Sequence, residues 1–197
     1  MNQGSEQSGP FFVMALEYMQ EPIMMKAATL LLLPLSLSAC ATTNASDSAL
    51  IGTANMIGTD GRSVGTASLI GEGNSLKLSV DASGLSSGTK GFHLHTTGKC
   101  DPSDFQSAGG HLNPYNKRHG FADPQGAHLG DLRNIVVRAD GSVSATVDVS
   151  GARDEVLPLI FDNDGTAVMI HSGPDDYVTD PAGNAGSRIA CGVLRPT

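Results

Sequence analysis

The chain has 197 residues, a length that suits one domain with short segments attached to it. Its formal net charge is −8 and no basic stripe runs along it, which argues against a nucleic-acid-binding protein. Glycine is abundant at 24 residues, tryptophan is absent, and short β-branched runs alternate with turn residues, which predicts an all-β domain.

The first 39 residues are predicted to lie outside that domain. Lys26 precedes an apolar run over residues 27–37, and the small residues Ser38 and Ala39 follow the run. A positive residue, a short apolar run and small residues, in this order, are typical of an export signal peptide. The run is too short to span a bilayer as a helix. A buried core helix is the alternative interpretation.

Residues 1–23 are acidic and mixed in composition, unlike a signal peptide. They suggest an over-extended start, with translation beginning at Met24 or Met25. The expected segments are an over-extended start plus signal peptide over residues 1–39, a lipidated cysteine with a polar tether over residues 40–48, and the domain over residues 49–197.

Cys40 follows the small residues directly, and the sequence Leu37-Ser38-Ala39-Cys40 resembles the lipobox of bacterial lipoproteins. The resemblance implies lipid on Cys40, cleavage before it, and a membrane as partner. Ala41 at the next position favours the outer membrane. Residues 41–48 are small and polar, as expected of a flexible tether. We therefore expect a lipid-anchored protein on the periplasmic side of a bacterial cell envelope.

Eight short runs have the composition of strands, with turn residues between them. The predicted strands cover residues 50–56, 63–71, 76–82, 91–96, 134–139, 142–149, 166–171 and 187–194. Long loops follow the fourth and seventh strands. Another connection spans residues 151–165, and its apolar residues 157–160 are expected to pack over one end of a barrel. Eight strands with regular turns predict a closed barrel or a sandwich.

Five of the six histidines fall within one window of about forty residues. His93 and His95 alternate with Phe92 and Leu94, which is typical of a strand. Side chains two residues apart on a strand share a face and lie roughly 6.6 Å apart along it. Two imidazoles at this spacing can converge on one ion. A single histidine on a strand is more often an ordinary core or surface residue, but the clustering argues against that alternative.

The other three histidines of the window are His111, His119 and His128, in a segment rich in glycine, proline and asparagine that closes on Asp131. A loop of this length without periodicity is usually functional or disordered. Metal ligation would keep it ordered, and imidazole suits both zinc and copper. The sixth histidine, His171, ends a later apolar run.

Five motifs resemble those of the copper/zinc superoxide dismutase family. They are Gly-Phe-His-Leu-His at 91–95, Gly-Gly-His-Leu-Asn-Pro at 109–114, Lys-Arg-His-Gly at 117–120, His-Leu-Gly-Asp-Leu at 128–132 and Gly-Asn-Ala-Gly-Ser-Arg-Ile-Ala-Cys-Gly-Val at 183–193. The resemblance covers about residues 49–193. It implies an eight-stranded Greek-key barrel or sandwich with two long functional loops.

Residue by residue, the resemblance implies one copper and one zinc per subunit. Copper would be bound by His93, His95, His111 and His171. Zinc would be bound by His111, His119, His128 and Asp131. His111 would bridge the two ions as an imidazolate, through both ring nitrogens. The residue types agree with this division, because an all-nitrogen site suits copper and a site with a carboxylate suits zinc.

The implied activity is the dismutation of superoxide to dioxygen and hydrogen peroxide by copper cycling between Cu(II) and Cu(I). Zinc has no redox chemistry and would be structural. A non-enzymatic metal-binding domain of the same fold is the alternative, and it would have lost a copper histidine or the arginine described next. A copper-delivery protein would carry a spare cysteine pair. The sequence does not distinguish a monomer from a homodimer.

Two residues outside the ligand set match functional positions of the family. Arg188 matches the arginine beside copper, where a guanidinium can pair with a small anion. A structural arginine is the alternative. Asp175 matches the aspartate that links a copper-ligand histidine to a zinc-ligand histidine. An exposed loop aspartate is the alternative, and the adjacent Asp176 competes with Asp175 for this assignment.

Residues 180–182 depart from the eukaryotic pattern, in which a lysine and a threonine guide superoxide toward copper. Other cations would have to steer the anion here. Lys99, Lys117 and Arg118 are the candidates, and solvated surface charges are an equally good interpretation of them.

If Cys40 is the lipid acceptor, as expected, Cys100 and Cys191 remain in a protein that is expected to be exported, where disulfides persist. A bond between them would enclose about ninety residues and contribute roughly 4.6 kcal/mol in the chain-entropy model. Two buried free thiols are the alternative.

Overall fold

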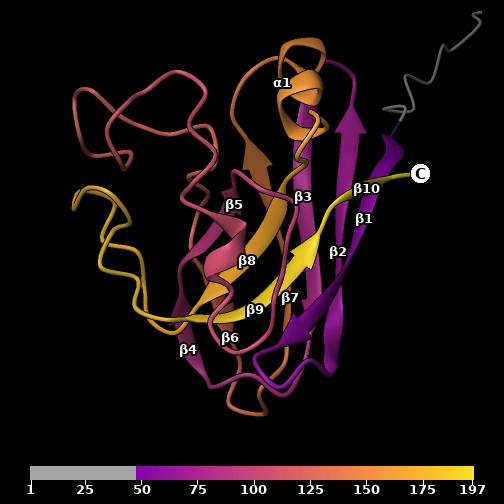
Figure 1. Cartoon of the computed structure of the whole chain (residues 1–197), viewed down its shortest axis with the longest axis vertical. Helices are drawn as coiled ribbons and strands as arrows, with labels where there is room; N and C mark the ends of the chain where they lie inside the picture. Colours follow the sequence, from indigo (N-terminus) through magenta and orange to yellow (C-terminus); the bar gives the residue numbers. More distant parts are fainter. Residues whose placement is uncertain (1–47) are drawn as a thin grey trace, which may run out of the picture. The chain divides into compact units, whose positions relative to one another are not determined.

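The computed structural model describes residues 48–197, which form ten strands, one α-helix and one 3-10 turn (Figure 1). The prediction of an all-β domain is therefore confirmed. The strands are β1 (Ser48–Gly58), β2 (Ser63–Glu72), β3 (Ser75–Ala82), β4 (Gly88–Lys90), β5 (Phe92–His95), β6 (Ile135–Val137), β7 (Val143–Val149), β8 (Ala167–His171), β9 (Arg188–Val193) and β10 (Arg195–Pro196). The helix is α1 (Arg153–Ile160), and the 3-10 turn covers Gln106–Ala108.

Eight of the strands form one curled antiparallel sheet in the order β5-β8-β9-β1-β2-β3-β7, with β10 paired to β1. Strands β3 and β7, and likewise β5 and β8, are neighbours in space but not in sequence, and such crossovers are typical of Greek-key topology. Leu69 of β2 lies opposite Leu78 of β3, and Leu78 lies opposite Val147 of β7. The register thus places apolar side chains side by side on the inner face.

The sheet is closed through the segment that joins β4 to β5. Gly91 alone separates the two strands, yet β5 pairs with β8 in the large sheet whereas β4 pairs with β6 in a two-stranded one. Strand β6 leads through the turn at Asp140-Gly141 into β7, which is the opposite edge of the large sheet. The chain therefore connects the two edges, and a barrel results.

Alternation along the strands sorts the core from the functional residues. Phe92 and Leu94 of β5 belong to the main apolar cluster, together with Val168 and Ile170 of β8. The intervening residues of β5 are the two histidines, which point to the other face and are also buried. The alternation predicted for this strand is confirmed, and the strand anchors the site directly to the core.

Each of the eight predicted strands overlaps a strand of the structure, but strands β4 and β10, helix α1 and the 3-10 turn were not predicted. Strand β4 is three residues long and β10 two, too short to leave a pattern in the sequence. Helix α1 covers eight residues of the connection over 151–165. Val156 and Ile160 share its buried face one turn apart. Pro158 lies inside the helix and, as a helix breaker in most contexts, conceals the helical pattern.

A smaller apolar cluster lies beneath the first long loop, where Phe105 and Ala108 pack with Met169 and Cys191. Cys100 and Cys191 form a disulfide with a Cα–Cα distance of 5.7 Å. The predicted pairing is thus confirmed, and the alternative of free thiols is excluded. The bond fastens the start of the loop to β9.

Residues 1–47, with the predicted signal peptide, Cys40 and most of the tether, lie outside the described residues. Within residues 48–197, no helix has the length and apolar character needed to cross a membrane. The two long loops, over residues 97–134 and 172–187, lie on the same side of the barrel (Figure 1).

Candidate metal centre

The first group of candidate ligands is carried mainly by strands. It comprises His93, His95, His111 and His171, and one ligand atom from each lies within 4.8 Å of the others. We call these four residues the strand-borne group. His93 and His95 are in β5, and His171 is the last residue of β8. His171 N–H also donates to the Gly91 carbonyl at 2.9 Å, so the end of β8 is fixed to the start of β5.

His111 reaches this group because its loop docks on the free edge of β5. The Thr96 N–H donates to Gly110 O at 2.9 Å, and the Leu112 N–H donates to Leu94 O at 2.8 Å. The Leu94 N–H in turn donates to the carbonyl of Gly130, at 2.9 Å. Two distant parts of the loop are therefore held at the strand, and each delivers a ligand, His111 and Asp131.

The ring nitrogens of the strand-borne group are unusual because they are buried and lack hydrogen-bond partners among residues 48–197. The atoms are Nδ1 of His93 and Nε2 of His95, His111 and His171. The opposite nitrogen of each ring lies within hydrogen-bond distance of an oxygen, respectively of Asp175, Gly109, Asp131 and Gly186. Buried polar atoms are rarely left unsatisfied. Four nitrogens converging in this way fit a copper ion.

The second group is carried by the loop and comprises His111, His119, His128 and Asp131. We call it the loop-borne group. Oδ1 of Asp131 lies 2.9, 3.0 and 3.1 Å from the Nδ1 atoms of the three histidines in that order. A tetrahedral zinc ion with ligands at 2.0–2.1 Å sets its ligand atoms roughly 3.3 Å apart. The group therefore has the dimensions of a zinc site.

Asp131 is oriented by the backbone around it. Its Oδ2 accepts hydrogen bonds from the N–H groups of Gly120 at 2.8 Å and His128 at 3.0 Å. Oδ1 is left for the three imidazoles. Burial opposes the charged form, but the surrounding histidines and N–H groups outweigh it and hold the pKa of Asp131 well below its usual range. The carboxylate is thus ionised, as a metal ligand must be.

His111 belongs to both groups through different atoms, with Nδ1 facing Asp131 and Nε2 facing the strand-borne group. Burial lowers the pKa of His111 to about 4 and that of His171 to about 3. Both rings are neutral near pH 7 and available to a cation. His119 differs: burial opposes its charged form, but Asp131 and Asp175 prevail and raise its pKa to about 9.

Asp175 connects the two groups. Its Oδ2 lies 2.7 Å from Nε2 of His93, and its Oδ1 lies 3.0 Å from Nε2 of His119. Asn134, which the sequence did not single out, holds the backbone of Asp175 through two hydrogen bonds of 2.9 and 3.0 Å. The adjacent Asp176 turns toward residues 178, 179 and 184 instead. Only Asp175 occupies the linking position.

Glycine is required at position 183 by this arrangement. Its φ is +64°, and a Cβ there would overlap the carboxylate of Asp175 and the ring of His119. Glycine also tolerates this backbone conformation without strain. The Gly183-Asn184 motif therefore allows the second loop to close directly over the linking aspartate.

Arg188 borders a cavity of about 300 Å³ that His95 and His171 also line. Its guanidinium donates to the carbonyls of Phe105 and Gly109, each at 2.6 Å. These contacts hold the guanidinium of Arg188 in the cavity that histidines of the strand-borne group line. Among the residues that line this cavity, Arg188 is the one with a permanent positive charge. The three candidate steering cations do not line it: Lys99 pairs with Asp101, Arg118 pairs with Asp123, and Lys117 lines a different cavity.

The family model described as copper/zinc superoxide dismutase matches residues 63–194, more than half of the chain. The chain belongs to the copper/zinc superoxide dismutase family. It is 43% identical to "Superoxide dismutase [Cu-Zn] 2" of Aquifex aeolicus over 146 residues, which is 72% of this chain and 85% of that protein. It is 37% identical to "Superoxide dismutase [Cu-Zn]" of Caulobacter vibrioides over 62% of this chain and 72% of the relative.

Solved structures agree with this assignment. A superoxide dismutase-like protein from Bacillus subtilis matches with a TM-score of 0.68 and 39% identity, over 73% of this chain and 97% of that one. The enzyme from Brucella abortus matches with a TM-score of 0.59 and 30% identity, over 76% and 100%. Copper/zinc superoxide dismutases convert superoxide to dioxygen and hydrogen peroxide, with copper and zinc as cofactors. The two ligand groups fit those cofactors.

Proposed function

We propose that this chain dismutates superoxide with copper held by the strand-borne group and zinc held by the loop-borne group. The observation that carries the assignment is the set of buried ring nitrogens that converge from His93, His95, His111 and His171 and that have no partner within residues 48–197. All seven ligand residues and Arg188 are present, so the non-enzymatic alternative has no support in the chain itself.

When bound, copper supplies the one-electron redox chemistry by which one superoxide is oxidised and another is reduced with uptake of two protons. Arg188 would hold the anion, because its guanidinium lies in the same cavity as His95 and His171. The imidazole of His111 has both nitrogens directed at ligand groups, and Nε2 is the atom at which a proton can be held and passed to the product.

Zinc would act on the shape of the loop. His119, His128 and Asp131 come from a segment that holds no strand or helix, and a cation at their centre would fix it against β5. Asp175 would orient one histidine of each group, as carboxylates behind metal-bound histidines commonly do.

Metal analysis together with an activity assay tests the assignment. The chain from residue 48 onward, loaded with both metals, should hold one copper and one zinc and dismutate superoxide. Removal of copper alone should abolish the activity and leave zinc bound. Activity that persisted without copper would refute the proposal.

The location of the enzyme is a separate proposal and rests on sequence alone. Leu37-Ser38-Ala39-Cys40 follows a short apolar run, and a small polar tether separates Cys40 from the domain. One acyl chain binds a membrane only marginally, whereas two or more anchor a protein stably. We propose that lipid on Cys40 anchors the enzyme at the bacterial envelope, in the outer membrane, with its copper site in water.

Fractionation tests this location. The native protein should partition into detergent with the membranes and begin at Cys40, and Cys40→Ser should release it or leave it unprocessed. A wild-type protein that is wholly soluble in the periplasm and begins elsewhere would exclude the lipid anchor without affecting the dismutase assignment.

A further inference from the structure

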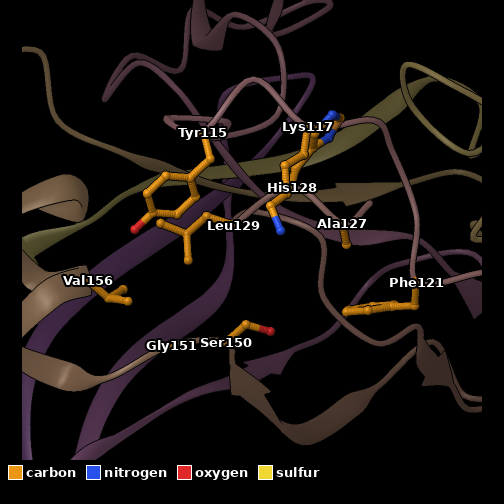
Figure 2. Close-up of a pocket in the computed structure, with 9 residues that line it drawn as sticks. All are labelled: Tyr115, Lys117, Phe121, Ala127, His128, Leu129, Ser150, Gly151 and Val156. Carbon is orange, nitrogen blue, oxygen red and sulfur yellow. The ribbon is translucent and has the colours of Figure 1, made fainter. Parts of the chain in front are cut away.

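A second cavity, of about 260 Å³, lies between the loop that carries the zinc ligands and the junction of β7 with α1. Figure 2 shows Tyr115 and Leu129 on one side, facing Val156 of α1 and Ser150 across the cavity. Its volume is slightly below the range of roughly 300–1,000 Å³ that is usual for drug-sized ligands. The cavity therefore suits a molecule smaller than a drug-sized ligand.

The walls of this cavity are mostly apolar, with two nitrogen-bearing side chains among them. Figure 2 shows Lys117 and His128 together at one side of the cavity. None of the residues that line the cavity is acidic, although the chain as a whole carries a net charge of −8. Within residues 48–197 the ammonium group of Lys117 forms no ion pair. The cavity is thus complementary to a small anion with an apolar body.

His128 offers a second polar group beside Lys117. In each of the other non-bridging histidines, the ring nitrogen that faces away from the ligand group lies within hydrogen-bond distance of a protein oxygen. These histidines are His93, His95, His119 and His171. His128 is only 6% exposed, but its Nε2 is not among the fully buried atoms and forms no hydrogen bond within residues 48–197, so this nitrogen is accessible to water or to a ligand. Its Nδ1 faces Asp131, so a zinc ion there would fix the proton on Nε2 and make it a donor.

We propose that this cavity binds a small aromatic carboxylate. The carboxylate accepts hydrogen bonds from Lys117 and from Nε2–H of His128, and the ring lies between Tyr115, Leu129 and Val156. An anion on His128 would complete the pairing of carboxylate, histidine and zinc that such sites commonly use. The inference rests on the proposed zinc site only for the proton position on His128.

Benzoate is a suitable probe, with benzamide as the uncharged control of the same shape. Titrations of the copper-reduced, zinc-loaded protein, followed by amide chemical shifts, should show benzoate perturbing Ser150 and Val156. His128 also borders the cavity that Arg188 lines, so the residues whose amide shifts change show which of the two cavities benzoate occupies. Shifts confined to Ala182 and Arg188 would overturn the proposal, as would benzamide binding as tightly as benzoate.

Two variants test the contacts. Lys117→Gln should weaken benzoate about tenfold, as expected when one charge-assisted hydrogen bond is lost. Lys77→Gln, which removes the same charge from β3, should leave its affinity unchanged. Ser150→Phe should block the cavity and abolish binding. Lys117→Gln and Ser150→Phe proteins that bind benzoate like the wild type would refute the site.

Zinc release to a chelator gives a readout that does not depend on activity. Benzoate should slow the release about tenfold in the wild type and less in Lys117→Gln, because an acceptor on Nε2 strengthens a histidine ligand. Equal release rates with and without bound benzoate would exclude the contact to His128. Metal content measured on the same samples shows separately whether the proposed metal sites are occupied. Amide shifts measured on metal-free protein show whether benzoate binds in this cavity, whatever the outcome for the metal sites.

Discussion

The two halves of the metal centre share His111 but are built in different ways. The strand-borne group draws His93, His95 and His171 from β5 and β8, which are paired strands backed by the apolar core. The loop-borne group takes its ligands from residues 111–131, where regular structure is absent and polar atoms converge on Asp131. The first is prearranged mainly by the sheet, whereas the second has no strand or helix to fix its ligands.

Removing a ligand from the strand-borne group should have the largest effect on activity. His95→Ala takes one nitrogen from copper and leaves the sheet and its core intact, so dismutation should fall at least about 1,000-fold. Circular dichroism and zinc content should stay close to those of the wild type. Near-normal activity in a variant shown to lack copper would disprove the copper assignment.

Removing a ligand from the loop-borne group should loosen the loop more than it lowers the dismutase activity. Asp131→Asn should weaken zinc at least about 100-fold and increase amide hydrogen exchange over residues 97–133, with a smaller activity loss than His95→Ala. Asp140→Asn, at the exposed turn before β7, is the matched control. If zinc content and thermal stability were unchanged, Asp131 would not be a ligand.

The link between the groups should have a smaller effect, which is spread over both metals. Asp175→Asn keeps the size of the side chain but cannot accept from both His93 and His119. Affinity for copper and zinc should each fall about 10- to 100-fold. Asp176→Asn alters an adjacent, exposed carboxylate and should change neither. Equal metal affinities in the two variants would contradict the linking role.

In the metal-free protein, buried histidines of the two groups should affect the free energy of unfolding in different pH ranges. Burial holds the pKa values of His111 and His171 at about 4 and 3, below the ordinary 6.5, so the unfolded chain binds protons that the folded one does not. Stability should therefore fall as the pH decreases from 6.5, by at most about 1.4 kcal/mol per pH unit for each ring. The pKa of His119 is raised to about 9, so its contribution is present below pH 6.5 and lost as the pH rises through 9.

Urea unfolding at a series of pH values measures this dependence. The midpoint should be highest near pH 6.5 and decrease in both directions, and His119→Gln should flatten the alkaline side alone. A midpoint that stayed constant between pH 4 and 6.5 would show that the strand-borne rings are not neutral when buried.

Much of this site was predictable because its ligands carry periodic or compositional signals. Alternation around His93 and His95 gave the strand, and the glycine-rich surroundings of His111 and His119 gave the loop. The ligand sets came from the resemblance of the motifs to a family, since spacing cannot show which loop residue meets which strand. Asn134 was missed because it acts on the backbone of Asp175, a contact that depends on tertiary structure. Helix α1 was missed because Pro158 conceals it.

His111 and Asp175 touch both groups, and this has a thermodynamic consequence for how the enzyme is loaded. Two sites that share a ligand and a carboxylate cannot fill independently, so each ion changes the free energy of binding the other. Linkage makes that coupling reciprocal: whatever factor zinc adds to the affinity for copper, copper adds to the affinity for zinc. The order in which the ions enter alters the path but not the total, and half-loaded chains should be scarcer than chance occupancy predicts whenever the coupling is favourable.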